Sequence, residues 1–415
     1  MNTPGQAPQD SVAVELSASR GQSGEEPLPG QAGVRRVALN SLFWGARSTG
    51  SGQYLHNLLP HLAALQPETS YVLLGPAGAK QTQDDGTWPR HTLRTPFDGA
   101  SRNLGKVWFE QVAFPRACQH IEADVAHVPY FAPPLWPTIP TVVTIHDLIP
   151  LLLPTYRATW AIRAYVRLVS LAARRASLVL TDSEASARDI VRHLGLPRER
   201  LRVIYLAVDA SYHPVAPEAR GEVLRRLALP DEFLLYLGGF DHRKSVIPLL
   251  EAYARARERL QGLPLVLAGR LPRKDSAFAP DPRPAIARLG LEGQVYLPGW
   301  VDEADKPALY SAALAFCFPS AYEGFGLPVL EAISCGTPAI VAAGSSLQEV
   351  AGHGGLVVPP GDVAALSAAL VRLASERTLR AELSDAGLQH AQRFSWKRTA
   401  AQTLAAYEQA MRPAS

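Results

Sequence analysis

The chain has 415 residues, of which 47% are hydrophobic and 19% are charged, and its formal net charge is only +3. This length exceeds what one ordinary core covers, so two domains are expected, and the near-neutral charge gives no reason to expect a nucleic-acid partner. Three scattered cysteines, Cys118, Cys317 and Cys335, argue against a disulfide framework or a zinc site. The sequence has no apolar stretch of roughly eighteen residues and no signal-peptide pattern, so we expect a cytoplasmic protein.

The first half alternates between short apolar strands and helical patterns. Residues 1–32 are rich in Gly, Pro, Ser and Gln without periodicity, which predicts a disordered segment. From Val34 the chain shows a strand, "VRRVALNS", a glycine-containing turn, "STGSGQY", and a helix through "YLHNLLPHLAAL". Further helices are predicted near 105–121, 157–175 and 184–194. This pattern predicts a Rossmann-like domain over residues 33–210.

The second half repeats the alternation. Residues 209–232 look like a charged loop, after which "FLLYLGG" begins a second set of buried strands. The helices predicted in this half lie near 246–260, 283–289, 328–335, 362–374 and 378–391. We therefore predict a second Rossmann-like domain over 211–394, followed by a terminal helix within 395–415 with Ser395 as its N-cap. The predicted fold class is α/β, with two doubly wound parallel sheets that face one another.

A dinucleotide-binding enzyme is the first alternative, because a strand, a glycine turn and a helix open the domain. The turn supplies Gly50 and Gly52, but Leu55 stands where the third glycine should be, and no acid follows the second strand. NAD is therefore a weak candidate. The glycines instead indicate that a backbone or a ligand passes close to this turn.

Two acids flank the loop in "YEGFGLPVLEAISCGTP". Pro328 suits the start of a helix and Gly336 the left-handed residue after its end, so Glu331 is expected in the first helical turn and Glu323 on the loop before it. The N–H groups of the glycine-rich loop are then free to face a ligand. Carboxylates that accept from hydroxyls, beside a helix N-terminus that attracts anions, suit a polyhydroxylated anionic ligand. A surface loop with two solvated acids is the alternative.

A cationic loop follows the first strand of the second domain, in "YLGGFDHRKSVIPLLEAYARA". Gly238 and Gly239 precede Arg243 and Lys244, and a helix begins directly afterwards. Two adjacent cations at the carboxyl edge of a parallel sheet predict a diphosphate site, and an ordinary solvated loop is the alternative.

The span from about residue 34 to 411 resembles the retaining, nucleotide-sugar-dependent glycosyltransferases of family four. The resemblance rests on "STGSGQY", "VVTIHDLIPLLLP", "GGFDHRK" and the E-x7-E motif "EGFGLPVLE", which occur in the family's order across both domains. The segments "HDLIPL" and "RFSWKRTA" resemble in particular the bacterial mannosyltransferases that build O-antigen and exopolysaccharide. The resemblance implies the GT-B fold, with a C-terminal helix that crosses back to the N-terminal domain.

The resemblance also implies roles in the donor site. Glu331 is expected to hold the ribose hydroxyls, and Glu323 to bind the transferred hexose and stabilise positive charge at its anomeric carbon. Arg243 and Lys244 are expected to hold the diphosphate, with Gly239 in the same donor-binding set. The backbone expected to contact sugar and phosphate is that of Gly324, Phe325, Gly326 and Leu327.

Three residues of the first domain are implied as well. His146 in "TIHD" is expected to face the sugar as a positioning and polarising group, and Gly50 and Gly52 to form the turn that faces the phosphate. Alternatively, His146 is a core histidine at a strand end whose hydrogen bonds are all made within the protein. Gln53 stands where relatives often carry Arg, and Ser245 where many carry Asn, so the acceptor and phosphate contacts stay open.

The implied reaction transfers a hexose, with mannose favoured, from a nucleotide diphosphate sugar to a hydroxyl of a glycan or lipid-linked acceptor. GDP-mannose is the favoured donor and a UDP-sugar the alternative. The implied mechanism is a same-face attack with the leaving phosphate as base. No cofactor and no metal are expected, because Arg243 and Lys244 supply fixed positive charge. A nucleotide-sugar epimerase or phosphorylase on the same fold and a binding-only relative are the rival functions.

The predicted helix near 157–175 carries a run of basic residues among Trp, Tyr and aliphatic side chains. Two interpretations stay open: a helix that lies on an anionic membrane at the inner face of the plasma membrane, or a core-packed helix with an exposed basic face. The basic residues are Arg157, Arg163, Arg167, Arg174 and Arg175.

Overall fold

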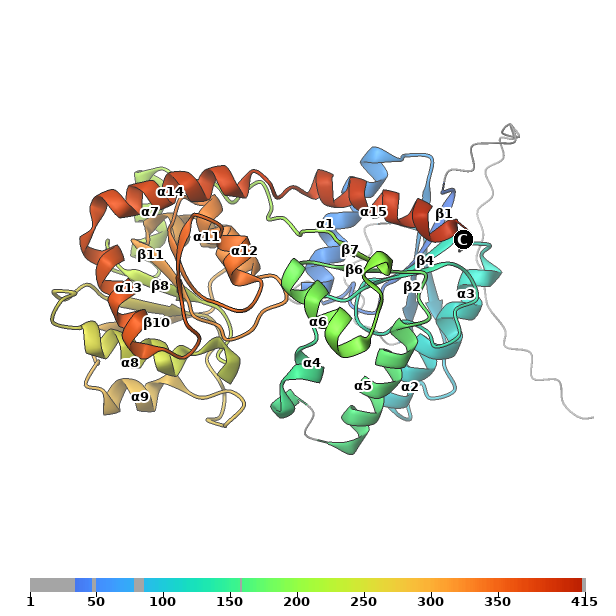
Figure 1. The fold of residues 1–415 in the computed structure, drawn as a ribbon, viewed down its shortest axis with the longest axis horizontal. Helices are drawn as coiled ribbons and strands as arrows, with labels where there is room; N and C mark the ends of the chain where they lie inside the picture. The colour runs from blue at the N-terminus through green and yellow to red at the C-terminus, as the bar shows by residue number, and fades with distance from the viewer. Residues whose placement is uncertain (1–33, 47–49, 78–85, 157–158, 413–415) are drawn as a thin grey trace, which may run out of the picture.

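The computed structural model describes residues 34–46, 50–77, 86–156 and 159–412, so the segment 1–32, predicted to be disordered, lies outside the described residues. The described chain forms two parallel sheets, each flanked by helices, and these lie side by side in Figure 1. This is the GT-B fold, as predicted. Among the described residues, no helix is long and apolar enough to cross a membrane.

The first sheet has seven strands in the order β3-β2-β1-β4-β5-β6-β7. Its strands are β1 (Arg36–Asn40), β2 (Ser70–Pro76), β3 (Arg90–Leu93), β4 (Val125–Val128), β5 (Thr141–Thr144), β6 (Leu178–Thr181) and β7 (Leu201–Val203). Its helices are α1 (Gly50–Leu65), α2 (Arg102–Trp108), η1 (Phe109–Ala113), α3 (Phe114–His120), α4 (Ile149–Leu152), α5 (Trp160–Ala173) and α6 (Glu184–Leu194), with 3-10 turns η2 (Pro154–Tyr156) and η3 (Arg198–Arg200). Every residue of β4, β5 and β6 is buried, as β-branched and apolar runs in a parallel sheet require.

The second sheet has six strands in the order β10-β9-β8-β11-β12-β13. They are β8 (Leu234–Leu237), β9 (Leu265–Ala268), β10 (Val295–Gly299), β11 (Ala315–Phe318), β12 (Ala339–Ala342) and β13 (Gly355–Val358). Its helices are α7 (Pro217–Arg226), η4 (His242–Lys244), α8 (Val246–Ala256), α9 (Pro282–Arg288), η5 (Glu303–Asp305), α10 (Lys306–Ala312), α11 (Leu327–Ser334), α12 (Leu347–Ala351), α13 (Val363–Ser375) and α14 (Arg377–Ala391).

The terminal helix α15 (Trp396–Met411) returns to the first domain, as Figure 1 shows. Ser395 is its N-cap, as predicted, and accepts a hydrogen bond from the Arg398 N–H. The helix packs against α1 and the central strands of the first sheet. Tyr407 is fully buried there, and its hydroxyl lies 2.7 Å from Nδ1 of His127 on β4. The last described helix therefore packs on the domain that contains β1.

Two local predictions were wrong. The stretch 209–232 was expected to be a loop, but it contains α7, which starts at Pro217 and packs on α10. The glycines of "STGSGQY" were placed in a turn, but α1 begins at Gly50 and includes both of them. The helix expected near 105–121 is confirmed as one continuous run from Arg102 to His120, formed by α2, the π-helical turn η1 and α3.

The strand order places the ligand-binding edge of the second domain. Strands β8 and β11 are neighbours at the point where the order reverses, with Leu234 opposite Ala315. In doubly wound sheets, ligands bind at the carboxyl ends of the strands beside such a switch point. The loop with Arg243 follows β8 and the loop with Glu323 follows β11, so the two predicted sites meet at one edge.

Candidate active site

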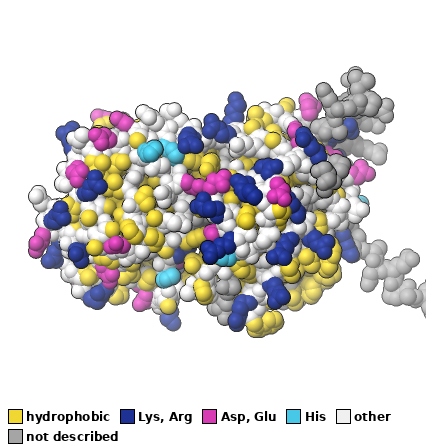
Figure 2. Space-filling model, viewed as in Figure 1, with side chains coloured by type: hydrophobic (Ala, Val, Ile, Leu, Met, Phe, Trp, Pro, Cys, Tyr) yellow, Lys and Arg dark blue, Asp and Glu magenta, His cyan; other side chains and the backbone are white. Residues whose placement is uncertain are grey.

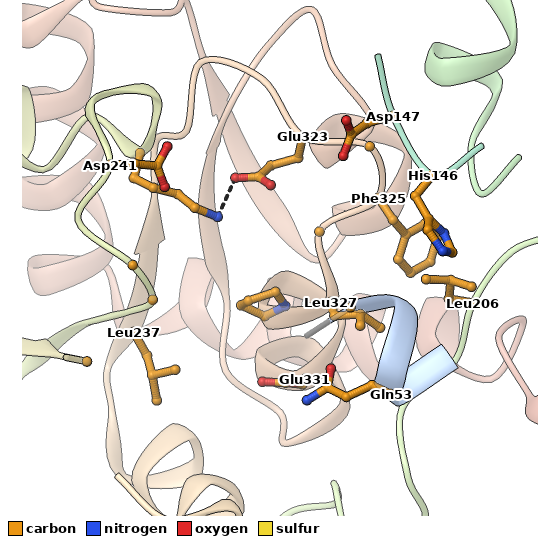
Figure 3. Close-up of a pocket in the computed structure, with 18 of the residues that line it drawn as sticks. Gln53, His146, Asp147, Leu206, Leu237, Asp241, Glu323, Phe325, Leu327 and Glu331 are labelled. Carbon is orange, nitrogen blue, oxygen red and sulfur yellow. Dashed lines mark hydrogen bonds and ion pairs between the residues drawn. The ribbon is translucent and has the colours of Figure 1, made fainter. Parts of the chain in front are cut away.

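A cavity of about 660 Å³ opens between the two domains. Its walls combine the loops after β8 and β11 with the start of α1 and the segment after β5 (Figure 3). The predicted site residues that line it are Gly50, His146, Gly239, Arg243, Lys244, Glu323, Gly324, Phe325, Gly326, Leu327 and Glu331. The structure therefore brings together the loops that the sequence marked separately.

Glu323 is held by both predicted cations. Lys244 Nζ lies 2.7 Å from Oε1 of Glu323, and Arg243 Nη1 lies 2.7 Å from Oε2. The Ser320 hydroxyl donates to Oε1 at 2.6 Å. Burial alone would raise the pKa of the Glu323 carboxyl, but Lys244 and Arg243 outweigh burial and lower the pKa. Glu323 is therefore an ionised carboxylate, 9% exposed at the cavity wall.

Arg243 also joins the two domains. Its Nε lies 3.0 Å from Oδ1 of Asp241, and it donates to the hydroxyl of Tyr156, from the first domain, at 3.2 Å. The Tyr156 hydroxyl donates to the same Asp241 oxygen at 2.6 Å. Lys244 Nζ sits over the ring of Phe318, 4.7 Å from its centroid. Both cations are thus fixed by neighbours before any ligand arrives.

The loop from Gly324 to Leu327 lies against the first domain. The Gly324 carbonyl accepts from Ser183, the N-cap of α6, at 2.7 Å, and lies 3.1 Å from the Ser186 hydroxyl. A Cβ on Gly324 would lie 2.2 Å from the carbonyl oxygen of His146, so only glycine permits this approach. Within the described chain, the N–H groups of residues 324–326 donate no hydrogen bond and are free for a ligand.

Glu331 was predicted in the first turn of its helix and lies instead in the second. The helix begins at Leu327 and is capped by Gly326, whose φ of 109° suits glycine. The Glu331 carboxylate accepts from the Tyr310 hydroxyl at 2.7 Å. Burial raises the pKa of Glu331, against the lowering effect of Lys306 and Tyr310. Figure 3 shows Gln53 of α1 beside Glu331 in the cavity.

Both ring nitrogens of His146 are engaged within the first domain. Nδ1 lies 2.6 Å from Oδ2 of Asp182, and Nε2 lies 3.1 Å from the carbonyl oxygen of Pro129, which only accepts. Burial lowers the pKa of His146, but the Asp182 and Asp147 carboxylates and the Pro129 carbonyl together outweigh burial, so the pKa is raised. In this conformation neither ring nitrogen is free to take a proton from a ligand.

Gly50 and Gly52, expected together at the phosphate, play different structural parts. Gly50 is the first residue of α1 and lines the cavity. Gly52 is buried, does not line the cavity, and lets the helix pass close to the preceding turn, because a Cβ there would lie 2.2 Å from the Ala46 carbonyl oxygen.

The chain matches two family models. Residues 48–212 match the model described as Glycosyltransferase Family 4, and residues 225–390 match Glycosyl transferases group 1. The O-antigen chain mannosyltransferase B of Escherichia coli is 35% identical over 269 residues, which is 64% of this chain and 70% of that protein. The chain belongs to the family 4, group 1 glycosyltransferases.

A second mannosyltransferase shares less of its length with this member of the family, and two solved structures share its fold. The MMP alpha-(1->4)-mannosyltransferase of Mycolicibacterium hassiacum is 36% identical over 60% of this chain, but the match spans 57% of that protein. Among solved structures, Anabaena HepE in complex with UDP and glucose superposes with a TM-score of 0.66 at 21% identity, over 89% of this chain and 98% of that one. WaaG, a glycosyltransferase involved in lipopolysaccharide biosynthesis, has a TM-score of 0.65 at 17% identity, over 89% of this chain and 98% of that chain. These structures support the fold.

Four contacts of this glycosyltransferase were not foreseen in the sequence. Tyr156 binds Asp241 and Arg243, Ser320 binds Glu323, and Tyr310 binds Glu331. Ser320 lies three residues before Glu323, so its contact has a local signal, whereas Tyr310 is 21 residues from Glu331 and has none. Tyr156 had no such signal, because its partner is 85 residues away in another domain.

Proposed function

We propose that this glycosyltransferase transfers mannose, with retention, from GDP-mannose to a hydroxyl of a glycan or lipid-linked acceptor. The observation that carries the proposal is Glu323, an ionised carboxylate held between Lys244 and Arg243 beside the free N–H groups of residues 324–326. Donors that are nucleotide sugars are general in the family. The choice of mannose is supported by relatives named as mannosyltransferases at 35% and 36% identity.

The mechanism follows from two charges that develop as the glycosyl phosphate breaks. The departing diphosphate gains negative charge, which Arg243, Lys244 and the N–H groups before α11 stabilise. The sugar gains positive charge at the anomeric carbon, which Glu323 stabilises at its ring face. The acceptor hydroxyl attacks from the side the phosphate leaves, and the phosphate takes its proton. His146, with both nitrogens engaged, holds its loop against Gly324 and orients the sugar pocket.

A donor screen tests the proposed function directly. Purified protein is given GDP-mannose, UDP-glucose or UDP-N-acetylglucosamine, with and without phosphate, and release of the nucleoside diphosphate is measured. GDP release from GDP-mannose alone is the expected result. Product that forms only with added phosphate would indicate a phosphorylase. A nucleotide sugar that is changed but not cleaved would indicate an epimerase. No turnover of any donor would indicate a binding-only protein.

Glu331 is proposed to hold the ribose, so Glu331→Ala is expected to weaken nucleoside diphosphate binding about ten- to a hundredfold. A charge-assisted hydrogen bond is worth roughly 1.5–3 kcal/mol, which corresponds to that factor. Calorimetry with GDP alone measures it. The control is Glu292→Ala, an exposed acid of the second domain that does not line the cavity, and it should bind GDP like the parent. Unchanged GDP affinity in Glu331→Ala would refute the ribose role.

Transfer is expected to continue in excess EDTA. Arg243 and Lys244 bring two fixed positive charges to the proposed diphosphate position, where metal-dependent enzymes use a divalent cation. The measurement is the rate of GDP release after dialysis against EDTA, then after addition of Mg²⁺ or Mn²⁺. Loss of turnover that Mg²⁺ restores would contradict this assignment of the two cations.

We propose that the enzyme acts in the cytoplasm, where nucleotide sugars are made, because its cysteines are free thiols. All three cysteines are buried and free, and burial raises the pKa of Cys118 and Cys335, so they behave as core residues.

A further inference from the structure

The outer face of α5 carries apolar and basic side chains instead of a mixed polar surface. Trp160, Arg163, Arg167 and Leu171 recur at helical spacing and are all exposed, while Val166 on the opposite face is buried. Trp160 is 77% exposed and Leu171 46%. Large apolar side chains that face solvent in a group indicate a surface that something else covers.

Two segments that contact α5 or the adjoining π-helical turn also expose large apolar side chains. Leu104 on α2 is 53% exposed and lies two residues from exposed Arg102. Trp136, on the loop between β4 and β5, is 70% exposed. Together Leu104, Trp136, Trp160, Arg163 and Arg167 define what we call the α2–α5 surface.

A buried junction holds the three segments together. Glu110 of η1 accepts from the Tyr165 hydroxyl of α5 at 2.9 Å, and Lys106 of α2 lies over the same tyrosine ring. The next residue, Gln111, accepts from the N–H of Leu135, which precedes Trp136, at 2.9 Å. The π-helical turn that contains Glu110 and Gln111 thus fixes the helices and the loop in one arrangement.

The α2–α5 surface has no exposed carboxylate on its helices. The described elements α2, η1, α3 and α5 contain one acid, Glu110, and it is fully buried. In Figure 2 the surface over α2 and α5, at the lower right, shows dark blue and yellow side chains without magenta. The face is therefore both cationic and apolar.

We propose that the α2–α5 surface docks on an anionic lipid bilayer. Tryptophan suits the interface between headgroups and acyl chains, aliphatic side chains enter the hydrocarbon, and arginines attract anionic headgroups. Nucleic acid is a poorer match, because Leu104 and Leu171 cannot stack on bases. A second copy of the chain is disfavoured too, since two such faces would bring only like charges together.

The surface lies close to the catalytic cavity. Tyr156, which binds Asp241 and Arg243 at the cavity, precedes Trp160 by four residues, so a chain path of at most about 14 Å separates them. An acceptor anchored in the bilayer would then present its sugar at the cleft. This last step rests on the proposed function, whereas docking on lipid does not.

Vesicle co-sedimentation tests the docking without any donor. The full chain is mixed with phosphatidylcholine vesicles that contain or lack phosphatidylglycerol, at low and high salt. We expect binding to the anionic vesicles only, lost at high salt. The double variant Arg163→Gln with Arg167→Gln should weaken binding about 25-fold, because each cation contributes about fivefold. Trp160→Ala should weaken binding on the order of tenfold.

The matched control is Arg255→Gln with Arg259→Gln, which removes the same charge from exposed positions of the second domain. It should bind vesicles like the parent, and all variants should keep their melting temperature and donor hydrolysis. The proposal is overturned if the Arg163 and Arg167 variant binds as tightly as the parent, if neutral vesicles bind equally well, or if binding is seen only to nucleic acid or a second copy. Absent hydrolysis with intact vesicle binding would instead refute the proposed function alone.

Discussion

Replacing Lys244 with alanine is expected to slow transfer about a hundred- to a thousandfold. Its ammonium lies 2.7 Å from Glu323 and is fixed over Phe318 at the place where the diphosphate would develop charge. Removal of one preorganised donor from such a site costs on the order of 2.7–4 kcal/mol of transition-state stabilisation. The measurement is kcat for GDP release from GDP-mannose, with Lys397→Ala, an exposed lysine of α15, as the control.

The variant must be separated from simple misfolding. Lys244→Ala leaves Glu323 with one cation, and breaking a buried ion pair destabilises a fold by about 3–5 kcal/mol. The double variant Lys244→Ala with Glu323→Gln removes the uncompensated charge, so its melting temperature should recover part of the loss while its activity stays low. A Lys244→Ala enzyme within about threefold of the parent rate would show that the diphosphate binds elsewhere.

Lys244→Ala should also change the pH dependence of the enzyme. In the parent, Lys244 and Arg243 lower the pKa of Glu323 against the effect of burial. Loss of Lys244 removes one of these two lowering effects, so the pKa of Glu323 rises. The acid limb of the rate profile, where Glu323 becomes protonated, should therefore move to higher pH.

The architecture was predictable because buried parallel strands leave a strong pattern. The runs at β8 and β11, "LLYL" and "AFCF", are buried at every position and were visible as continuous apolar segments. Ser395 was predictable because an N-cap serine before an apolar period is a local signal. Strand β3, "RHTL", was missed, since it is the edge strand and only Leu93 in it is buried. Helix α7 was missed because charged residues fill most of its exposed surface.

The site was predictable in composition but not in its contacts. Glu323 and Lys244 each sit in a recognisable motif, yet their ion pair joins residues 79 positions apart. Glu331 was placed one position too early, at the end of the first turn instead of the start of the second, because Pro328 was taken as the first helical residue and is the second. No local sequence pattern predicts the contact between Gly324 and His146, because the two residues meet only when the two domains pack together.

Hydrogen bonds donated by hydroxyl groups join the two domains. Tyr156 reaches Asp241, Tyr322 donates to Asp189 at 2.6 Å, and Ser183 donates to Gly324. The two bonds to carboxylates are worth about 1.5–3 kcal/mol each, and the bond to the Gly324 carbonyl about 0.5–1.5 kcal/mol. Because these bonds are few and separate, we expect the cleft to open and close around donor and product.

Gly324→Ala is expected to reduce kcat at least about a hundredfold with little loss of thermal stability. The new Cβ would lie 2.2 Å from the His146 carbonyl oxygen and 2.8 Å from Cβ of Asp147, both in the opposite domain. Backbone at this distance must move apart, and a displacement of about 1 Å in a catalytic site costs on the order of a hundredfold in rate. Each domain keeps its own core, because the overlap disappears when the cleft opens.

Two further variants make the test specific to closure. Gly221→Ala on α7 adds the same methyl group where it meets only the end of Arg225 at 3.4 Å, and it should keep full activity. Ser183→Ala removes one donor to the Gly324 carbonyl and should cost about fivefold, less than the methyl group, because the Ser186 hydroxyl stays 3.1 Å from the same oxygen. Small-angle scattering with saturating GDP should show the parent compact and Gly324→Ala open. If Gly324→Ala compacts and turns over like the parent, the contact between Gly324 and His146 is not part of the productive state.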